Sequence, residues 1–183
     1  MTRPRFSIDD AGICGEATWV PSPNFDERPE GAKVELVVIH NISLPPGEFG
    51  GPWIDALFQN RLDPDAHPYF RDIASLEVSA HFLIRRDGEL RQYVGTDDRA
   101  WHAGVSQWKG RERCNDFSVG IELEGADDVP FSEHQYEMLA ELVRALSERY
   151  GNLEFAGHSD VAPGRKTDPG PWFDWARFRA SVT

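Results

Sequence analysis

Nearly every residue between Val34 and Ile39 is apolar, and His40 follows directly. Strands that are buried on both faces read as continuous apolar runs, whereas strands with one solvated face alternate apolar and polar residues. The segment therefore predicts the first core strand of a sheet that is covered on both sides. It also predicts that an imidazole lies at the end of this strand.

Further strands are predicted from Phe117 to Leu123, from Leu153 to Ala156, and over residues 78–84 and 89–94. An Asp-Gly pair at residues 87–88 separates the last two segments, and this pair favours a tight turn between antiparallel strands. We expect the resulting hairpin to form a β-meander against the first strand.

The longest predicted helix follows Ser132, because Gln135 completes a capping box and Gly151 is a natural C-cap. Its apolar stripe comprises Leu139, Leu142, Val143, Leu146 and Tyr150. Shorter helices are predicted over Trp53–Arg61 and residues 172–180. This order of elements predicts the α/β class, with one mixed β-sheet flanked by helices.

Length and composition fit one domain over residues 1–183, with a core from about residue 21 to 180. The formal net charge of −12 argues against a nucleic-acid partner. No signal-like or membrane-spanning apolar run is present, so we expect a cytoplasmic protein without membrane attachment. Cys14 and Cys114 read as free thiols. No feature indicates an obligate protein partner.

Three polar residues near predicted strand ends, His40, His158 and Asp168, could bind one metal ion. Two imidazoles and a carboxylate can hold Zn²⁺ and leave its fourth position open for water, as hydrolases require. The same donors suit the Fe(II) of a non-haem oxygenase. His158 and Asp168 are ten residues apart, which departs from the close pair usual in such oxygenases.

Two further residues could assist hydrolysis. Glu122 lies in an apolar strand context that would raise its pKa and suit a general base, although it could also point outward into solvent. Gly120 in the same strand is expected to allow close approach of neighbouring backbone. Lys166 could place an ammonium beside a developing oxyanion, or it could be an ordinary surface lysine.

The remaining histidines compete with these assignments. His67 and His134 read as loop and solvated residues, and His81 is expected to pack rather than to face a cleft. His102 follows a tryptophan and is equally consistent with a ligand contact and a structural role. The Pro- and Gly-rich segment Ser43–Gly51 predicts a rim loop, which is either static or a mobile lid.

Long segments of the chain strongly resemble the cytoplasmic 1,6-anhydro-N-acetylmuramyl-L-alanine amidases of the AmpD type. The resemblance runs from about Pro21 to Phe178 and is carried by VVIHNISLPPGEFGGPWIDALF, HPYF, VSAHFLIRRDGE, RAWHAGVS, GRERCNDFSVGIELEG and GHSDVAPGRKTDPGPWFDWARFR. It implies the mixed-sheet fold of the phage lysozyme-like amidases and peptidoglycan recognition proteins. A non-catalytic peptidoglycan-binding module on that fold would be expected to lack a complete metal set.

The resemblance implies a zinc amidase that cuts the amide between anhydromuramic acid and the L-alanine of the stem peptide during peptidoglycan recycling. Its zinc ligands correspond to His40, His158 and Asp168. Glu122 matches the general base of the family, and Lys166 matches the residue that stabilises the transition state.

Substrate contacts are expected at Asn41, Trp101, His102 and Arg113. Trp101 offers an apolar platform for the sugar, Asn41 a hydrogen bond to the peptide, and Arg113 a fork for the diaminopimelate carboxylate. With Lys109 and Arg111, Arg113 would form a local positive patch. Glu77 departs from the family pattern, which has an arginine there that also reaches the stem peptide.

Overall fold

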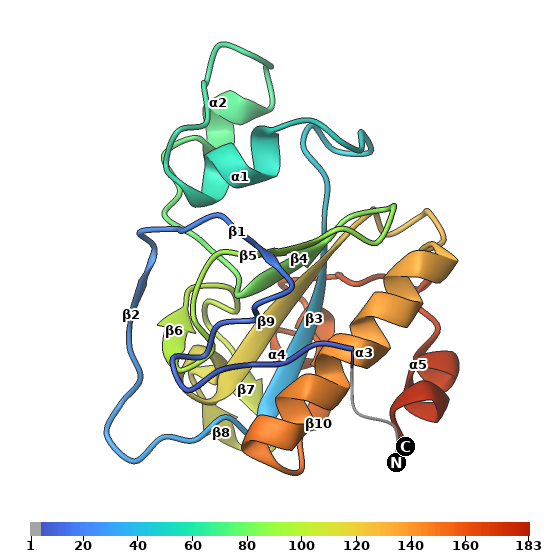
Figure 1. Ribbon diagram of the computed structural model, residues 1–183. Helices are drawn as coiled ribbons and strands as arrows, with labels where there is room; N and C mark the ends of the chain where they lie inside the picture. The colour runs from blue at the N-terminus through green and yellow to red at the C-terminus, as the bar shows by residue number, and fades with distance from the viewer. Residues whose placement is uncertain (1–4) are drawn as a thin grey trace.

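The computed structural model describes residues 5–183 and contains a six-stranded mixed sheet (Figure 1). The strand order is β1–β5–β4–β9–β3–β10. These strands are β1 Thr18–Trp19, β3 Leu36–Ile42, β4 Phe82–Ile84, β5 Leu90–Gln92, β9 Ser118–Glu124 and β10 Glu154–Gly157. β4 and β5 pair antiparallel, and the other neighbours pair parallel. The predicted α/β class with helices flanking a mixed sheet is confirmed.

The remaining elements are helices and two small ribbons. The helices are α1 Trp53–Phe58, α2 Phe70–Ile73, α3 Glu133–Tyr150, α4 His158–Val161 and α5 Trp175–Val182, with a 3₁₀ turn, η1, at Cys114–Phe117. The ribbons pair β2 Phe25–Glu27 with β6 Asp98–Ala100, and β7 Gln107–Trp108 with β8 Arg111–Glu112. Within residues 5–183, no helix has the length and apolarity needed to cross a membrane.

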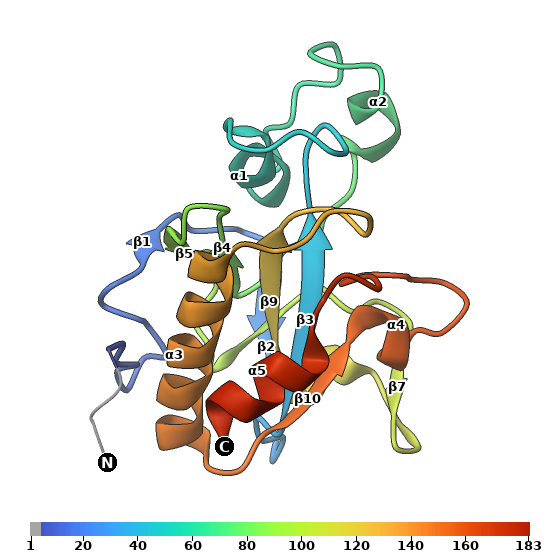
Figure 2. The ribbon, with the colours of Figure 1, turned by 90° about the vertical axis from the view of Figure 1, so that its right-hand side faces the viewer.

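Helices α3 and α5 cover one face of the sheet, whereas α1 and α2 lie beyond the end of β3 (Figures 1 and 2). The capping box that begins α3 forms as predicted: the Ser132 hydroxyl accepts from the Gln135 backbone N–H, and the Gln135 carboxamide accepts from the Ser132 N–H. Gly151 ends the helix with φ of 85°. The apolar stripe of α3 packs into the main hydrophobic cluster.

The two central strands present different residues to the two faces of the sheet. Because successive strand residues point to opposite sides, Val37 and Ile39 join the cluster beneath α3 and α5, whereas Val38 joins a smaller cluster on the other face. His40 shares the side of Val38, and the register of β3 and β9 pairs it with Glu122. The two polar side chains therefore stand next to each other on the face opposite α3.

Two details differ from the sequence-based expectations. The predicted hairpin forms, but β4 pairs with β9 rather than with β3, so the β-meander against the first strand is wrong. The reason is that β9 offers seven residues that match β3 along its whole length, whereas β4 has three. The first strand also continues past His40 to Ile42, which places the imidazole inside the strand.

Candidate functional site

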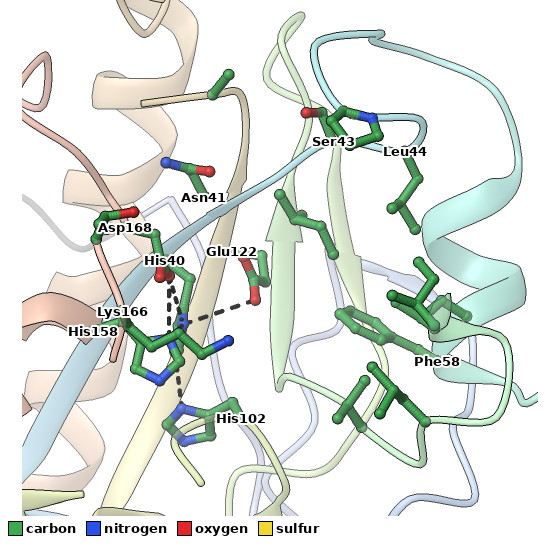
Figure 3. A pocket seen from close by; sticks show the side chains of 18 of the residues that line it. His40, Asn41, Ser43, Leu44, Phe58, His102, Glu122, His158, Lys166 and Asp168 are labelled. Atoms are coloured by element: carbon green, nitrogen blue, oxygen red, sulfur yellow. Dashed lines mark hydrogen bonds and ion pairs between the residues drawn. The ribbon is translucent and has the colours of Figure 1, made fainter. Parts of the chain in front are cut away.

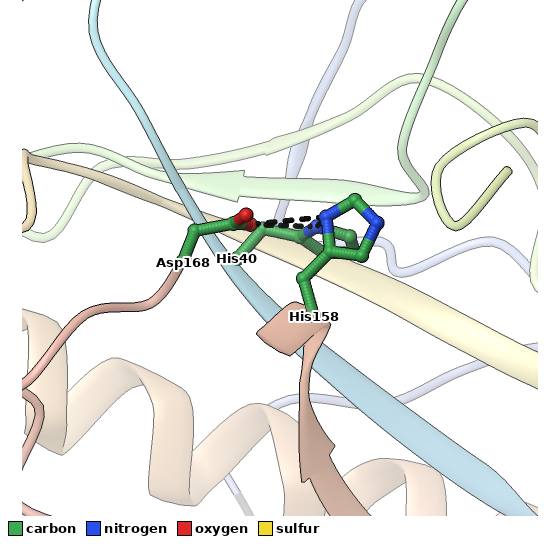
Figure 4. Close-up of side chains that lie close together, drawn as sticks. All are labelled: His40, His158 and Asp168. Carbon is green, nitrogen blue, oxygen red and sulfur yellow. Dashed lines mark hydrogen bonds and ion pairs between the residues drawn. The ribbon is translucent and has the colours of Figure 1, made fainter. Parts of the chain in front are cut away.

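The side chains of His40, His158 and Asp168 converge on one point (Figure 4). The two Nδ1 atoms lie 3.0 Å apart, and Asp168 Oδ2 lies 3.1 Å from His40 Nδ1 and 3.2 Å from His158 Nδ1. His40 is on β3, His158 begins α4, and Asp168 follows in the next loop. The structure therefore brings together the three ligands that the sequence predicted.

Strand pairing explains why the two histidines meet. β10 runs parallel to β3, and Gly157 is paired with Ile39. A histidine follows each residue of this pair, so the register places His40 and His158 side by side. Both side chains are almost fully buried.

Backbone contacts hold the loop that carries Asp168. The Ser159 N–H donates to the Asp168 carbonyl at 2.9 Å, which ties the loop to the first turn of α4. Pro169 packs against Gly157 so closely that a Cβ on the glycine would lie 2.7 Å from the proline ring. A side chain at position 157 would therefore push the Asp168 loop away from the histidines.

The donor set fits a zinc ion. The Nε2 atom of His158 lies 3.0 Å from the Ala103 carbonyl, which can only accept, so Nε2 carries the proton and Nδ1 keeps its lone pair. Zinc bonds of about 2.1 Å in a tetrahedron separate the ligand atoms by about 3.4 Å. The observed 3.0–3.2 Å separations are close to that spacing.

Burial and the neighbouring side chains keep these groups in their metal-binding protonation states. Burial lowers the pKa of His40, an effect that the Asp168 carboxylate only partly opposes, so the imidazole is neutral near pH 7. Burial raises the pKa of Asp168, but the two imidazoles that face its Oδ2 outweigh burial and lower this pKa below the usual value. A neutral imidazole and an ionised carboxylate are the forms that bind metal.

Glu122 lies beside this cluster and is only 8 % exposed. Its Oε1 is 3.9 Å from His40 Nδ1, and its Oε2 is buried without a hydrogen-bond partner among residues 5–183. Burial, followed by repulsion from Asp168, raises its pKa well above the usual value, and the Lys166 charge opposes the shift. Glu122 is thus the buried carboxylate rather than the solvated one.

A cavity of about 490 Å³ opens in front of these residues (Figure 3). His40, His158, Asp168, Glu122 and Lys166 form one end. Apolar residues of the loop after β3, of α1 and of the segment around α2 form the other end, among them Leu44, Leu57, Phe58, Ile73, Leu76 and Val78. The cavity therefore joins a polar cluster to an apolar wall.

Lys166 is exposed, yet its side chain extends towards the cavity. Its backbone N–H donates to the Ala162 carbonyl at 3.0 Å, so the residue is held by the turn that ends α4. Its charge favours the ionised form of Glu122. The ammonium is therefore close enough to act on charge within the site.

Three of the predicted substrate contacts, Asn41, Trp101 and His102, line the cavity. The Asn41 amide group donates to Asp127 Oδ1 at 2.6 Å and to the Pro169 carbonyl at 3.1 Å. Both amide hydrogens are thereby used, and only the side-chain oxygen is left to accept from a ligand. The Trp101 ring is half-buried and its N–H donates to Asp26.

Arg113 does not line this cavity but borders a neighbouring hollow. Its side chain is 71 % exposed and lies 3.4 Å from Asp116. Lys109 and Arg111 each form an ion pair with a glutamate, so the predicted positive patch is largely neutralised. Glu77 is exposed and also lies outside the cavity lining.

Asp127 is a site residue that the sequence did not reveal. It accepts from Asn41 and from the Thr167 hydroxyl, so it links the segment after β9 to the loop that carries Asp168. Gly170 makes room for this contact, since a Cβ there would lie 2.6 Å from Asp127. In the sequence, Gly170 is the one signal of this contact. Asp127 itself gives none, because aspartates are common on loops.

The loop Ser43–Gly51 is tied to the sheet at its far end. The Gly50 N–H donates to Glu124 Oε2 at 3.0 Å, and Arg85 donates to the Gly51 carbonyl at 2.8 Å. Arg85 and Glu124 also form a buried ion pair with each other. Lid motion of this loop stays a prediction.

His81 and His134 lie apart from the three predicted ligands. His81 is buried as expected, and burial lowers its pKa to about 3. Its Nδ1 accepts from the Gly120 N–H at 3.0 Å. The side chain of His134 is 67 % exposed, in agreement with the expectation that it is solvated.

Comparison with known families places this geometry in context. Residues 30–171 match the family model described as N-acetylmuramoyl-L-alanine amidase. The 1,6-anhydro-N-acetylmuramyl-L-alanine amidase AmpD of Citrobacter freundii is 62 % identical over 176 residues, covering 95 % of this chain and 94 % of the relative. AmpD of Escherichia coli K12 is 63 % identical over 169 residues, covering 91 % and 92 % respectively.

Solved structures agree with the sequence comparisons. The crystal structure of a selenomethionine derivative of AmpD matches with a TM-score of 0.93 at 62 % identity, covering 95 % of this chain and 98 % of that one. The amidase AmiD of E. coli, solved with anhydro-N-acetylmuramic acid–L-Ala–D-γ-Glu–L-Lys, matches with a TM-score of 0.60 at 27 % identity. That match covers 86 % of this chain and 65 % of AmiD.

The geometry predicts that His158→Ala or Asp168→Ala abolishes stoichiometric zinc binding, because each removes one of three converging donors. His134→Ala is the matched control, since that imidazole is exposed and distant. Zinc content after dialysis against metal-free buffer, measured by mass spectrometry, should be near one per chain for the control and near zero for the two variants. Full zinc content in either variant would show that the ion binds elsewhere.

Proposed function

Because the chain belongs to the N-acetylmuramoyl-L-alanine amidase family, and to its AmpD type, we propose that it is a zinc-dependent amidase of muropeptide recycling in the cytoplasm. The bond cleaved joins 1,6-anhydro-N-acetylmuramic acid to the L-alanine of the stem peptide. One observation carries this proposal: the donor atoms of His40, His158 and Asp168 converge beside the buried carboxylate of Glu122 at one end of a cavity.

In this proposal, His40, His158 and Asp168 hold the zinc ion. When bound, zinc supplies Lewis acidity and lowers the pKa of a coordinated water towards about 7. Glu122 accepts a proton from the attacking water and later returns it to the leaving nitrogen of L-alanine. Lys166 holds positive charge near the carbonyl oxygen that becomes negative.

The surroundings of Glu122 support its role as the base. Its Oε2 is buried and unpaired among residues 5–183, so no donor of the described protein competes for this oxygen. A buried carboxylate without a partner costs folding free energy, which a purely binding module would have no reason to retain. The complete donor set and this carboxylate together favour an enzyme over a non-catalytic module.

The cavity suggests how the substrate binds. Trp101 presents a half-buried ring against which a sugar can pack, and the free Asn41 oxygen can accept from a peptide N–H. The complex of AmiD with an anhydromuramyl tripeptide supports a ligand of this class for the family. Arg113, outside the cavity, would meet the far end of the stem peptide.

Glu122→Gln should lower kcat for anhydromuramyl-tripeptide by about 10²–10⁴, the usual contribution of a general base, while zinc binding remains. Glutamine keeps the size of the side chain but cannot take the proton. Glu137→Gln on the exposed face of α3 is the control and should be neutral. Product release is followed by mass spectrometry with zinc quantified in each sample. Near-normal turnover in zinc-loaded Glu122→Gln would remove Glu122 from this role.

Arg113→Ala should raise KM for a tripeptide substrate ending in diaminopimelate by about 10- to 100-fold, as expected for a lost charge-assisted hydrogen bond. A substrate ending at D-glutamate should be affected little, because it lacks the distal carboxylate. Arg111→Ala is the matched control, since Arg111 is paired with Glu35. Equal losses on both substrates would contradict the assignment, and Glu77 offers no second cation to replace Arg113.

A further inference from the structure

The ring of His102 lies against the edge of His40 that faces away from the other metal donors. His40 Nε2 is 2.9 Å from His102 Nδ1, whereas His40 Nδ1 faces His158 and Asp168. The two rings meet edge-on, with centroids 5.0 Å apart and an interplanar angle of 88°. Each nitrogen of His40 therefore has a separate task.

The other nitrogen of His102 is also used within the protein. His102 Nε2 lies 3.1 Å from the Ser118 hydroxyl at the start of β9. His102 is 9 % exposed, and with both nitrogens engaged the ring has no polar atom left for a ligand. This arrangement favours a role in supporting His40 over the direct substrate contact expected from the sequence.

The residues around the His102 ring fix its position. A Cβ on Gly120 would lie 2.5 Å from the His102 ring, so only glycine at that position of β9 admits the imidazole. The backbone N–H groups of His102 and Ala103 both donate to Asn115 Oδ1, at 3.2 and 2.9 Å. Hydrogen bonds to Asn115 thus fix the backbone of this segment, and the contact with Gly120 of β9 fixes the position of the ring.

The same two-residue segment contacts both histidine ligands. His102 meets His40 Nε2, and the neighbouring Ala103 carbonyl accepts from His158 Nε2 at 3.0 Å. Histidines that bind metal through one nitrogen are held by a hydrogen bond from the other, which fixes ring orientation and tautomer. His102 supplies this partner to His40, and the Ala103 carbonyl supplies it to His158.

Only one arrangement of protons along the chain allows His40 to bind metal through Nδ1. His40 Nε2–H must donate to His102 Nδ1, and His102 Nε2–H must then donate to the Ser118 hydroxyl. In the reverse arrangement His102 donates to His40, whose proton then occupies Nδ1 and blocks the metal. An acceptor at His102 Nδ1 is therefore required.

We propose that His102 is a positioning residue, which accepts the His40 Nε2–H and thereby holds His40 in the tautomer and orientation that bind zinc. Ser118 completes the arrangement by accepting from His102. This inference rests on the proposed zinc site and deepens it, since His102 touches neither the ion nor the substrate.

His102→Phe, which keeps an aromatic ring and removes the acceptor, should weaken zinc binding by about 10- to 100-fold, the usual effect of losing such a partner. His102→Gln retains an acceptor oxygen and should recover part of the affinity. His134→Phe is the control and should be unchanged. Affinity is measured by competition with a chromogenic chelator, and the fold of each metal-free variant is checked by thermal unfolding. Wild-type affinity in folded His102→Phe would overturn the proposal.

A second measurement needs no substitution and decides the question if His102→Phe does not fold. In zinc-loaded protein with ¹⁵N-labelled histidine, NMR should show His102 protonated at Nε2 and bare at Nδ1, with His40 protonated at Nε2. A proton on His102 Nδ1 would overturn the proposal even with zinc bound. Failure of the wild-type chain to bind zinc at all would instead overturn the proposed zinc site beneath it.

Discussion

The site depends on the parallel pairing of β3 with β9 on one side and β10 on the other. This register sets His40 beside Glu122 and brings His158 next to His40, so three polar groups from distant parts of the chain meet without any flexible element between them. Apolar packing on the opposite face, under α3 and α5, holds the strands in this register, because a one-residue slip would send the apolar side chains to the wrong face. Stability and function therefore share the same backbone pairing.

Burial governs the chemistry of the groups placed there. It favours neutral His40 and protonated Glu122, whereas the histidines keep Asp168 ionised against the same effect. Around these residues a second layer of contacts fixes geometry: Asn41 and Asp127 brace the loop of Asp168, and residues 102–103 meet both histidines. The three predicted metal ligands are thus held in place by hydrogen bonds with neighbouring residues.

Sequence patterns predicted those parts of the molecule that depend on local or strongly patterned signals. The α3 helix with its caps, the central strands and the convergence of His40, His158 and Asp168 were accessible in this way. The position of the hairpin beside β9 was not, because strand order depends on long-range pairing that no local pattern encodes. Gly120 was expected to allow close approach of backbone, but the group that approaches is the side-chain ring of His102, eighteen residues earlier in the chain. No local motif encodes a contact of that separation.

We propose that His40, His158 and Asp168 would hold a zinc ion with which the chain cleaves anhydromuramyl-peptides, and the most direct test is product analysis by mass with anhydromuramyl-tripeptide. The purified, zinc-quantified chain should release free tripeptide, lose that activity with a chelator, and regain it when zinc is restored. Stoichiometric zinc without any cleavage, or cleavage that persists after zinc has been removed, would contradict the account.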